Sequence, residues 1–185
     1  MSAARQREAR GRRLLLLRHA KATPPEPDAD DHERALSARG RRDAARIGEA
    51  LRRRGLAPEE VLCSSALRTR ETLELALPRP GRRLAVIVDR SLYLADPEAL
   101  LLRIALVRRT VASLLVVGHA PGLGLLALLL ARDGREGAIA RMQEKFPTGA
   151  LAALRFPAAS SWDLAPRSGF LDAFLTPREL AAAPG

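Results

Sequence analysis

The segment LLLLRHAKAT, from Leu14 to Thr23, decides how the chain is organised. Four consecutive leucines without helical periodicity are typical of a short strand buried on both faces, as in the middle of a parallel sheet. Arg18, His19 and Lys21 follow at the carboxyl end of this strand, the edge at which open α/β sheets build their sites. Taken alone, an Arg-His pair after a core strand is more often part of a basic surface loop, so a functional interpretation depends on other segments.

The length and composition predict one α/β domain. A chain of 185 residues is long enough for one sizeable core and short for two. Only 3% of the residues are aromatic, and a core built mainly of Leu and Ala favours helices packed on a sheet over an all-β sandwich. We expect residues 1–13, which are basic and without periodicity, to be a loosely ordered lead-in, and residues 14–185 to form a single domain.

Strands and helices are expected to alternate up to Ala131. Apolar runs, helix caps and helical spacing define these segments. The expected strands cover residues 14–17, 60–63, 84–88 and 113–117, and the expected helices cover residues 37–54, 66–77, 97–107 and 123–131. Ser64 and Ser65 are expected to cap the second of these helices. The alternation predicts a mostly parallel sheet with helices on both faces.

The C-terminal part predicts a different arrangement. Residues 132–137 have the composition of a turn. Residues 149–156 and residues 161–164, around Trp162, predict two strands in a hairpin-like return, antiparallel at the edge of the sheet. The final nine residues, PRELAAAPG, predict a short terminal helix and a tail.

Three predicted strand ends bring similar side chains to one edge of the sheet. His119 directly follows the strand at 113–117, as His19 follows the first strand, and Arg68 lies in the first turn of the helix after the second strand. Parallel neighbours would place both imidazoles and the guanidiniums in one pocket, which the Pro- and Asp-rich loop 23–31 would wall. Arginine at a helix start opposes the macrodipole unless an anion lies nearby, so the group predicts a phosphate site.

Other ligands fit these residues less well. Arginines would repel a metal ion, and no carboxylate or Cys lies at ligand spacing, so we expect no metal and no cofactor. The net charge of +10 suggests nucleic acid, but the basic clusters lack interleaved aromatic residues for base stacking, so no nucleic-acid partner is expected. His32 is expected at the surface, and the single Cys63 is expected to be a buried structural thiol.

The sequence predicts a cytoplasmic protein without a membrane partner. No apolar stretch reaches the ~20 residues that span a bilayer. The run of four leucines is also shorter than the ~7–15 residues of a signal-peptide core, and charged residues follow it at once. The positive field of the chain would help to attract an anionic substrate.

Four segments together resemble a known family. They are RHAKAT at 18–23, DHERALSARG at 31–40, SSALRTRET at 64–72 and VVGHAPGL at 116–123. With these motifs in this order, nearly the whole chain is similar to the histidine phosphatase superfamily, in its small SixA-like phosphohistidine phosphatase branch with a phosphoglycerate mutase-like fold. The resemblance implies that His19 is the catalytic nucleophile, and that Arg18, Arg68 and His119 bind the phosphate, with His119 also taking part in catalysis.

The implied chemistry is metal-independent phosphoryl transfer through a covalent phospho-His19 intermediate, which makes the protein a hydrolase. Asp96 and Glu98 are the candidate general acids, although both are well explained as helix-start residues. Because an imidazole leaving group needs less acid assistance than an alkoxide, the expected substrate is phosphohistidine on a partner protein. A phosphomonoesterase acting on a small phosphorylated metabolite and a non-catalytic phosphate-binding module remain as alternatives.

Overall fold

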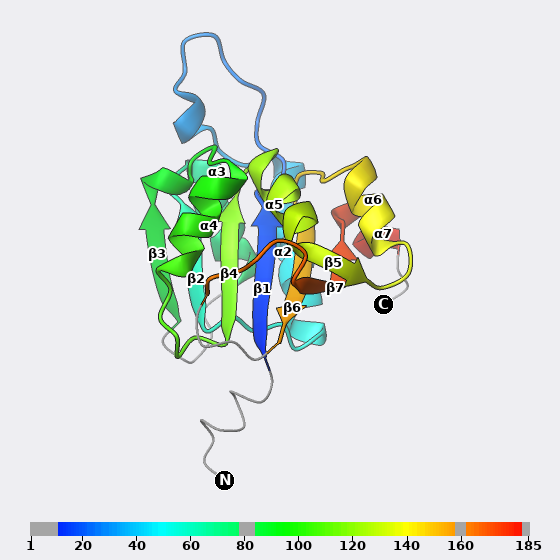
Figure 1. The fold of residues 1–185 in the computed structure, drawn as a ribbon. Coiled ribbons are helices and arrows are strands. Elements are labelled where there is room, and N and C mark those ends of the chain that lie inside the picture. The colour runs from blue at the N-terminus through cyan, green and yellow to red at the C-terminus, as the bar shows by residue number, and fades with distance from the viewer. Residues whose placement is uncertain (1–10, 78–83, 158–161, 183–185) are drawn as a thin grey trace.

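The four leucines form the centre of the fold. They belong to β1 (Arg12–Arg18), and all four are fully buried. The computed structural model describes residues 11–77, 84–157 and 162–182, and in these residues β1 is part of a seven-stranded sheet (Figure 1). β1 begins earlier than the expected start at Leu14. The rest of the predicted lead-in, residues 1–10, lies outside the described residues.

The order of the strands across the sheet is β3-β2-β4-β1-β6-β7-β5. Their bounds are Glu60–Ser64 for β2, Ala85–Asp89 for β3, Ser113–Gly118 for β4, Ala131–Gly134 for β5, Leu151–Phe156 for β6 and Gly169–Leu175 for β7. β1 is parallel to β4, and β2 is parallel to both β4 and β3. β6 is antiparallel to β1 and β7, whereas β5 is parallel to β7. Of the described strands, only β6 therefore runs against the rest, and the predicted mostly parallel α/β fold is confirmed.

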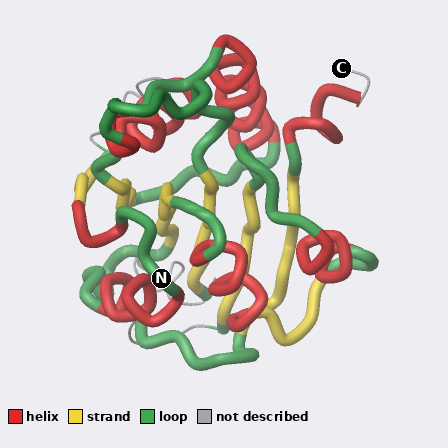
Figure 2. Tube along the Cα trace, turned by 90° about the horizontal axis from the view of Figure 1, so that it is seen from above, coloured by secondary structure: helices red, strands yellow, loops and turns green. Residues whose placement is uncertain are grey.

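Helices cover both faces of the sheet, as the view from above shows (Figure 2). One face carries α2 (Ala38–Arg53), α3 (Leu67–Ala76) and α7 (Pro177–Ala182), and the other carries α4 (Pro97–Ala105), α5 (Gly122–Leu130) and α6 (Ala138–Glu144). Leu14 and Leu16 pack in the core under α4 and α5, while Leu15 and Leu17 pack in the core under α2. The alternation of side chains along β1 thus supplies two cores, one on each face.

The C-terminal part differs from the prediction in three ways. The expected turn at 132–137 holds only for residues 135–137, because residues 131–134 form β5, which pairs with β7. Neither α6 nor β7 was predicted. The antiparallel strand is β6, which lies inside the sheet beside β1 rather than at an edge.

The expected strand around Trp162 is also wrong for residues 162–164, and Ser161 lies outside the described residues. The Trp162 ring is fully buried, and its Nε1 donates to the Val111 carbonyl at 3.1 Å. The Arg12 guanidinium lies 5.2 Å from the centre of the ring. Trp162 therefore packs against the start of β1, and residues 162–164 do not form a further strand.

The start of α3 is not capped as expected. Its N-cap is Ala66, which makes no side-chain hydrogen bond, and the hydroxyls of Ser64 and Ser65 bond to two histidines instead. Cys63 is fully buried as predicted, and burial raises the pKa of its thiol to about 12. In the parts of the chain that the structure describes, no helix has the length and apolar character needed to cross a membrane.

Candidate active site

The register between β1 and β4 brings two histidines together. Arg18 pairs with Gly118, so His19 and His119 are the next residues on two adjacent parallel strands. The His19 amide donates to the Gly118 carbonyl at 3.0 Å, and the two ring centroids lie 5.2 Å apart. His19 is 7% exposed and His119 is 3% exposed, so both rings are largely removed from water.

Two arginines complete this group. Arg68, in the first turn of α3, is 2% exposed, and its Nη2 lies 3.5 Å from Nδ1 of His119. Arg18 ends β1, and its Nη1 donates to the Phe146 carbonyl at 2.7 Å. These residues and His19 line a cavity of about 490 Å³, which the loop after β1 walls with two prolines. The structure therefore brings all four residues implied by the resemblance to one cavity. The loop that rises above the carboxyl ends of the strands in Figure 1 contributes to its lining.

The end of β2 and the start of α3 together support the site. Ser64 is the last residue of β2, and Arg68 and Thr72, four residues apart, lie on one face of α3. The Ser64 hydroxyl is 2.8 Å from Nε2 of His119, Arg68 lines the cavity, and Thr72 Oγ1 accepts from the Ala20 amide at 3.0 Å. One short segment thereby holds the second histidine, a guanidinium and the chain directly after His19.

The His19 ring is neutral and has a defined tautomer. Its Nδ1 lies 2.8 Å from the Ala20 carbonyl oxygen, and because a carbonyl only accepts, Nδ1 carries the proton. Burial, together with the charges of Arg68 and Arg18, lowers the pKa of His19 to about 4, against the opposing effect of the Ala20 hydrogen bond. At neutral pH the Nε2 atom therefore keeps its lone pair, the form in which imidazole is a nucleophile.

His119 is also neutral in the absence of an anion. Burial is the main reason that its pKa is lowered to about 3, and His19 and Arg68 lower it further. Because Arg68 donates toward Nδ1, the other nitrogen carries the proton and donates to the Ser64 hydroxyl. An anion bound beside the ring would raise this pKa, since a negative charge favours the imidazolium form.

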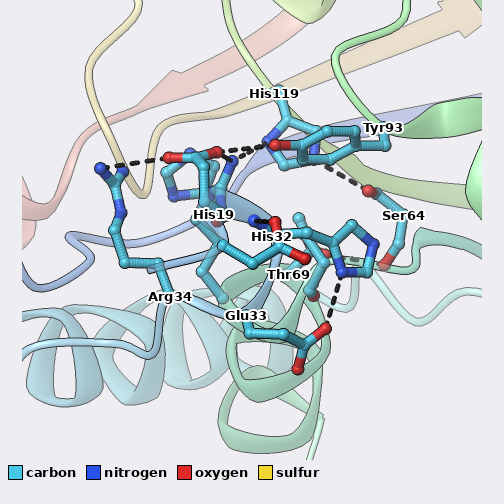
Figure 3. A network of polar contacts seen from close by, with 12 residues as sticks. His19, His32, Glu33, Arg34, Ser64, Thr69, Tyr93 and His119 are labelled. Atoms are coloured by element: carbon cyan, nitrogen blue, oxygen red, sulfur yellow. Dashed lines mark hydrogen bonds and ion pairs between the residues drawn. The ribbon is translucent and has the colours of Figure 1, made fainter. Parts of the chain in front are cut away.

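Three residues at the site, Asp31, Arg34 and Tyr93, were not assigned from the sequence; Figure 3 labels Arg34 and Tyr93 beside the two histidines. Oδ2 of Asp31 accepts from Arg68 Nη2 at 2.9 Å and from the Tyr93 hydroxyl at 2.7 Å, and Oδ1 lies 3.2 Å from Arg34 Nη1. The pKa of Asp31 is lowered below the usual range for a carboxyl, mainly by the hydrogen bond from Tyr93 and further by Arg68 and Arg34. Asp31 and Arg34 lie in the DHERALSARG segment, so the resemblance of this segment to the family is the feature that could have identified them as site residues.

The arginines at the cavity retain unused donors. Arg18, Arg34 and Arg68 each have a buried Nε without a hydrogen-bond partner in the part of the chain that the structure describes. All three residues line the same cavity. Because three guanidiniums surround this cavity, it favours a ligand with several acceptor oxygens. A phosphoryl group has that chemistry, and Arg binds it through charge-assisted hydrogen bonds.

His32 is buried, so its predicted surface position is wrong. It is 8% exposed, and its Nε2 lies 2.8 Å from the Ser65 hydroxyl. Its ring packs edge-on against Tyr93 at 5.0 Å, and Tyr93 packs edge-on against His119 at 5.2 Å. The physical reason is a 3₁₀ turn, Asp31–Glu33, which Asp30 caps and which folds the acidic loop back onto the start of α3.

The two candidate general acids lie elsewhere. Asp96 is the N-cap of α4, where its carboxylate accepts from the Ala99 amide at 2.8 Å, and Glu98 follows in the first turn. Neither lines the cavity, and of the described acidic residues only Asp31 does. No group of three or more His, Cys, Asp or Glu in the described residues is arranged to hold a metal ion.

Two histidines thus follow adjacent parallel strands, and Arg18, Arg34 and Arg68 surround the same cavity. The chain belongs to the histidine phosphatase superfamily (branch 1), whose family model matches residues 14–93. This span contains Arg18, His19 and Arg68, while His119 lies beyond it on β4.

Relatives and solved structures extend the similarity over most of the chain. An uncharacterised protein of Mycobacterium tuberculosis (strain H37Rv) is 40% identical over 166 residues, which cover 88% of this chain and 100% of the relative. The structure of a candidate phosphohistidine phosphatase SixA from Nakamurella multipartitia is 31% identical, with a TM-score of 0.77, and the match covers 90% of this chain and 96% of that one. A corresponding SixA structure from Agrobacterium tumefaciens is 29% identical, with a TM-score of 0.72 over 90% and 98% of the two chains. The family and these neighbours support a phosphatase with the phosphoglycerate mutase-like fold.

Proposed function

We propose that this protein is a metal-independent phosphatase that removes the phosphoryl group from protein phosphohistidine through a covalent phospho-His19 intermediate. The observation that carries the proposal is the His19 ring, which is neutral and has its Nδ1 proton fixed by the Ala20 carbonyl. The ring lines a cavity together with Arg18, Arg34 and Arg68. A fixed nitrogen lone pair beside several guanidiniums suits attack on a phosphoryl group.

In the first step, Nε2 of His19 attacks phosphorus in line, and the bond from phosphorus to the leaving atom breaks, with its electron pair going to the leaving group. Arg18 and Arg68 hold the equatorial oxygens and compensate the charge that spreads over them. His19 becomes positively charged as it gains the phosphoryl group. The Ala20 carbonyl stabilises that charge because it accepts the Nδ1 proton throughout.

In the second step, water attacks the phosphorus of phospho-His19, and the electron pair of the phosphorus–nitrogen bond returns to Nε2. The proton of the attacking water is lost to solvent, and inorganic phosphate leaves. The phosphoryl dianion raises the pKa of His119, so that the protonated ring donates a hydrogen bond to a phosphoryl oxygen. The guanidiniums thus supply the charge compensation for which kinases use Mg²⁺.

Two features favour phosphohistidine over ordinary phosphate esters. Asp31, the acidic side chain at the cavity, is held in its ionised form by Tyr93 and Arg68, so it is a poor proton donor for an alkoxide. An imidazole leaving group does not need this donor, because its second nitrogen carries a proton. The similarity to SixA structures from two bacteria adds support for a phosphohistidine-bearing partner protein.

The test is a substrate panel with purified protein in the presence of a chelator. A phosphohistidine peptide should be hydrolysed faster than sugar phosphates or nucleotides, and His19→Ala should lose at least ~10⁴-fold in turnover. Acid-labile phosphate should be trapped on the parent protein but not on the variant. Activity that requires added Mg²⁺ would contradict the mechanism, and a preference for one sugar phosphate would favour a small-metabolite phosphomonoesterase. Binding without turnover would favour a phosphate-binding module.

A further inference from the structure

A carboxylate lies inside a site that is otherwise built for an anion. Asp31 lines the cavity with Arg18, Arg34 and Arg68, and its side chain keeps 46% of its surface exposed. A negative charge at this place repels the dianionic phosphoryl group and so weakens substrate binding. It also occupies donors of Arg68 that a phosphoryl oxygen would otherwise use. We therefore expect this carboxylate to have a function that offsets the weaker phosphate binding.

The position of the carboxylate is fixed by its surroundings. Arg68 donates to the Asp31 backbone carbonyl at 2.5 Å as well as to the carboxylate, and the Tyr93 hydroxyl donates to the same carboxylate oxygen. Tyr93 is in turn packed between His32 and His119. His32, the next residue after Asp31, is buried and anchored to the Ser65 hydroxyl. These contacts fix Asp31 in the cavity wall, and Figure 3 shows their partner Tyr93 between His32 and His119 in the same polar network.

We propose that Asp31 is a specificity-determining residue that accepts a hydrogen bond from the ring N–H of an imidazole leaving group, and so selects phosphohistidine; this inference rests on the proposed function. Phosphohistidine differs from phosphoserine and from sugar phosphates in carrying an N–H donor on the leaving group, on the side away from phosphorus. A carboxylate that meets this donor gains a charge-assisted hydrogen bond. With a hydroxyl-derived leaving group the same carboxylate finds no such partner and contributes only repulsion.

The proton and charge balance of the transfer fits this role. The reactive substrate ring is protonated on its distal nitrogen, and that N–H donates to Asp31. As Nε2 of His19 attacks, the phosphorus–nitrogen bond breaks, its electron pair stays on the substrate nitrogen, and a neutral imidazole leaves with the distal N–H intact. One positive charge moves from the substrate ring to the His19 ring. Asp31 accepts the hydrogen bond from the substrate ring, as the Ala20 carbonyl accepts the hydrogen bond from the His19 ring.

The experiment compares two leaving groups on the same protein. Asp31→Asn keeps the shape of the side chain and a carbonyl oxygen for Arg68, but it removes the negative charge. We expect kcat/KM for a phosphohistidine peptide to fall about 30- to 100-fold, as for loss of a charge-assisted contact to the leaving group. For p-nitrophenyl phosphate, which has no N–H donor, kcat/KM should change less than about threefold or rise. Asp28→Asn, at an exposed acidic position of the same loop, is the matched control and should behave like the parent.

Calorimetric binding of inorganic phosphate separates this role from simple positioning of Arg68. Removing a like charge should tighten phosphate binding to Asp31→Asn severalfold, whereas loss of Arg68 orientation would weaken it. Weaker phosphate binding, or equal losses on both substrates, would overturn the role of Asp31 and leave the phosphatase proposal standing. A parent protein that hydrolyses p-nitrophenyl phosphate but not phosphohistidine would overturn both.

Discussion

His19 and His119 lie with their ring centroids 5.2 Å apart because β1 and β4 are parallel neighbours whose register pairs Arg18 with Gly118. A parallel pair delivers equivalent positions to the same edge, so two strand ends of similar sequence form one site. Burial leaves both imidazoles uncharged at neutral pH. The positive charge of the site therefore comes from Lys21 and the arginines rather than from the histidines.

The first prediction concerns the titration of the two histidines. In NMR spectra of the phosphate-free protein, the ring signals of His19 and His119 should not titrate between pH 5 and pH 8, because burial lowers their pKa values to about 4 and about 3. Saturation with vanadate or phosphate should raise the pKa of His119, since a bound anion favours imidazolium. A titration of either ring near pH 6.5 in the free protein would contradict the buried, neutral site.

The same shifts predict how stability depends on pH. The unfolded chain takes up protons on these histidines near pH 6.5, whereas the folded protein takes them up only near pH 4 and pH 3. The unfolding free energy should therefore decrease as the pH falls from about 6.5 to about 4, by at most about 1.4 kcal/mol per pH unit for each histidine. In denaturant titrations, His19→Gln should show a shallower loss than the parent over this range. Parallel curves for the two proteins would refute the linkage.

Loss of the clamp arginines should reduce turnover strongly. Arg18→Ala and Arg68→Ala should each cost at least about 2–4 kcal/mol of transition-state stabilisation, comparable to removal of an oxyanion donor. The two losses should not add in the double variant, because the guanidiniums act on the same phosphoryl group. Arg53→Ala is the control, since this side chain is 61% exposed and pairs only with Glu49 among the described residues. Equal losses in the control and the clamp variants would show that general positive charge is what matters.

The leaving-group dependence tests whether a general acid exists. Turnover of aryl and alkyl phosphates should fall steeply as the leaving group becomes more basic, because the departing oxygen must bear its charge without a proton donor. Asp96→Asn and Glu98→Gln should change the chemical step less than about twofold, since both carboxylates lie at the start of α4 and outside the cavity. A flat series in the parent that becomes steep in either variant would assign that residue as the acid.

Gly40 should be essential for the position of the loop after His19. A Cβ atom at Gly40 would lie 2.0 Å from the Lys21 carbonyl oxygen, so the first turn of α2 would be pushed off this loop. Gly40→Ala should destabilise the protein by about 1–3 kcal/mol and lower turnover, measured by denaturant unfolding and by kinetics. Arg42→Ala, at an exposed position of the same helix, should leave both unchanged. A fully stable Gly40→Ala protein would show that this contact is not tight.

Much of the site follows from local sequence pattern. The four leucines of β1 and the segment SLLVV of β4 are apolar without helical period, and each is followed closely by a histidine. Strands of this kind lie in the interior of a sheet, where neighbours are commonly parallel. Because parallel strands end at the same edge, both histidines reach one site. The place of Arg68 follows in the same way from the start of α3. These predictions succeed because each depends on one short segment and one general rule of sheet topology.

The sequence by itself thus determined the fold class and the meeting of His19, His119, Arg18 and Arg68, whereas tertiary structure decided what surrounds them. β7 was missed because its burial does not alternate regularly, and β6 lies inside the sheet because β7 and β5 pair beyond it. The contacts of Asp31 with Arg68 and Tyr93 join segments that are distant in the chain, through a loop without periodicity. Such contacts depend on where the 3₁₀ turn folds back and on which rotamers the packing allows, and no local pattern of residues encodes either.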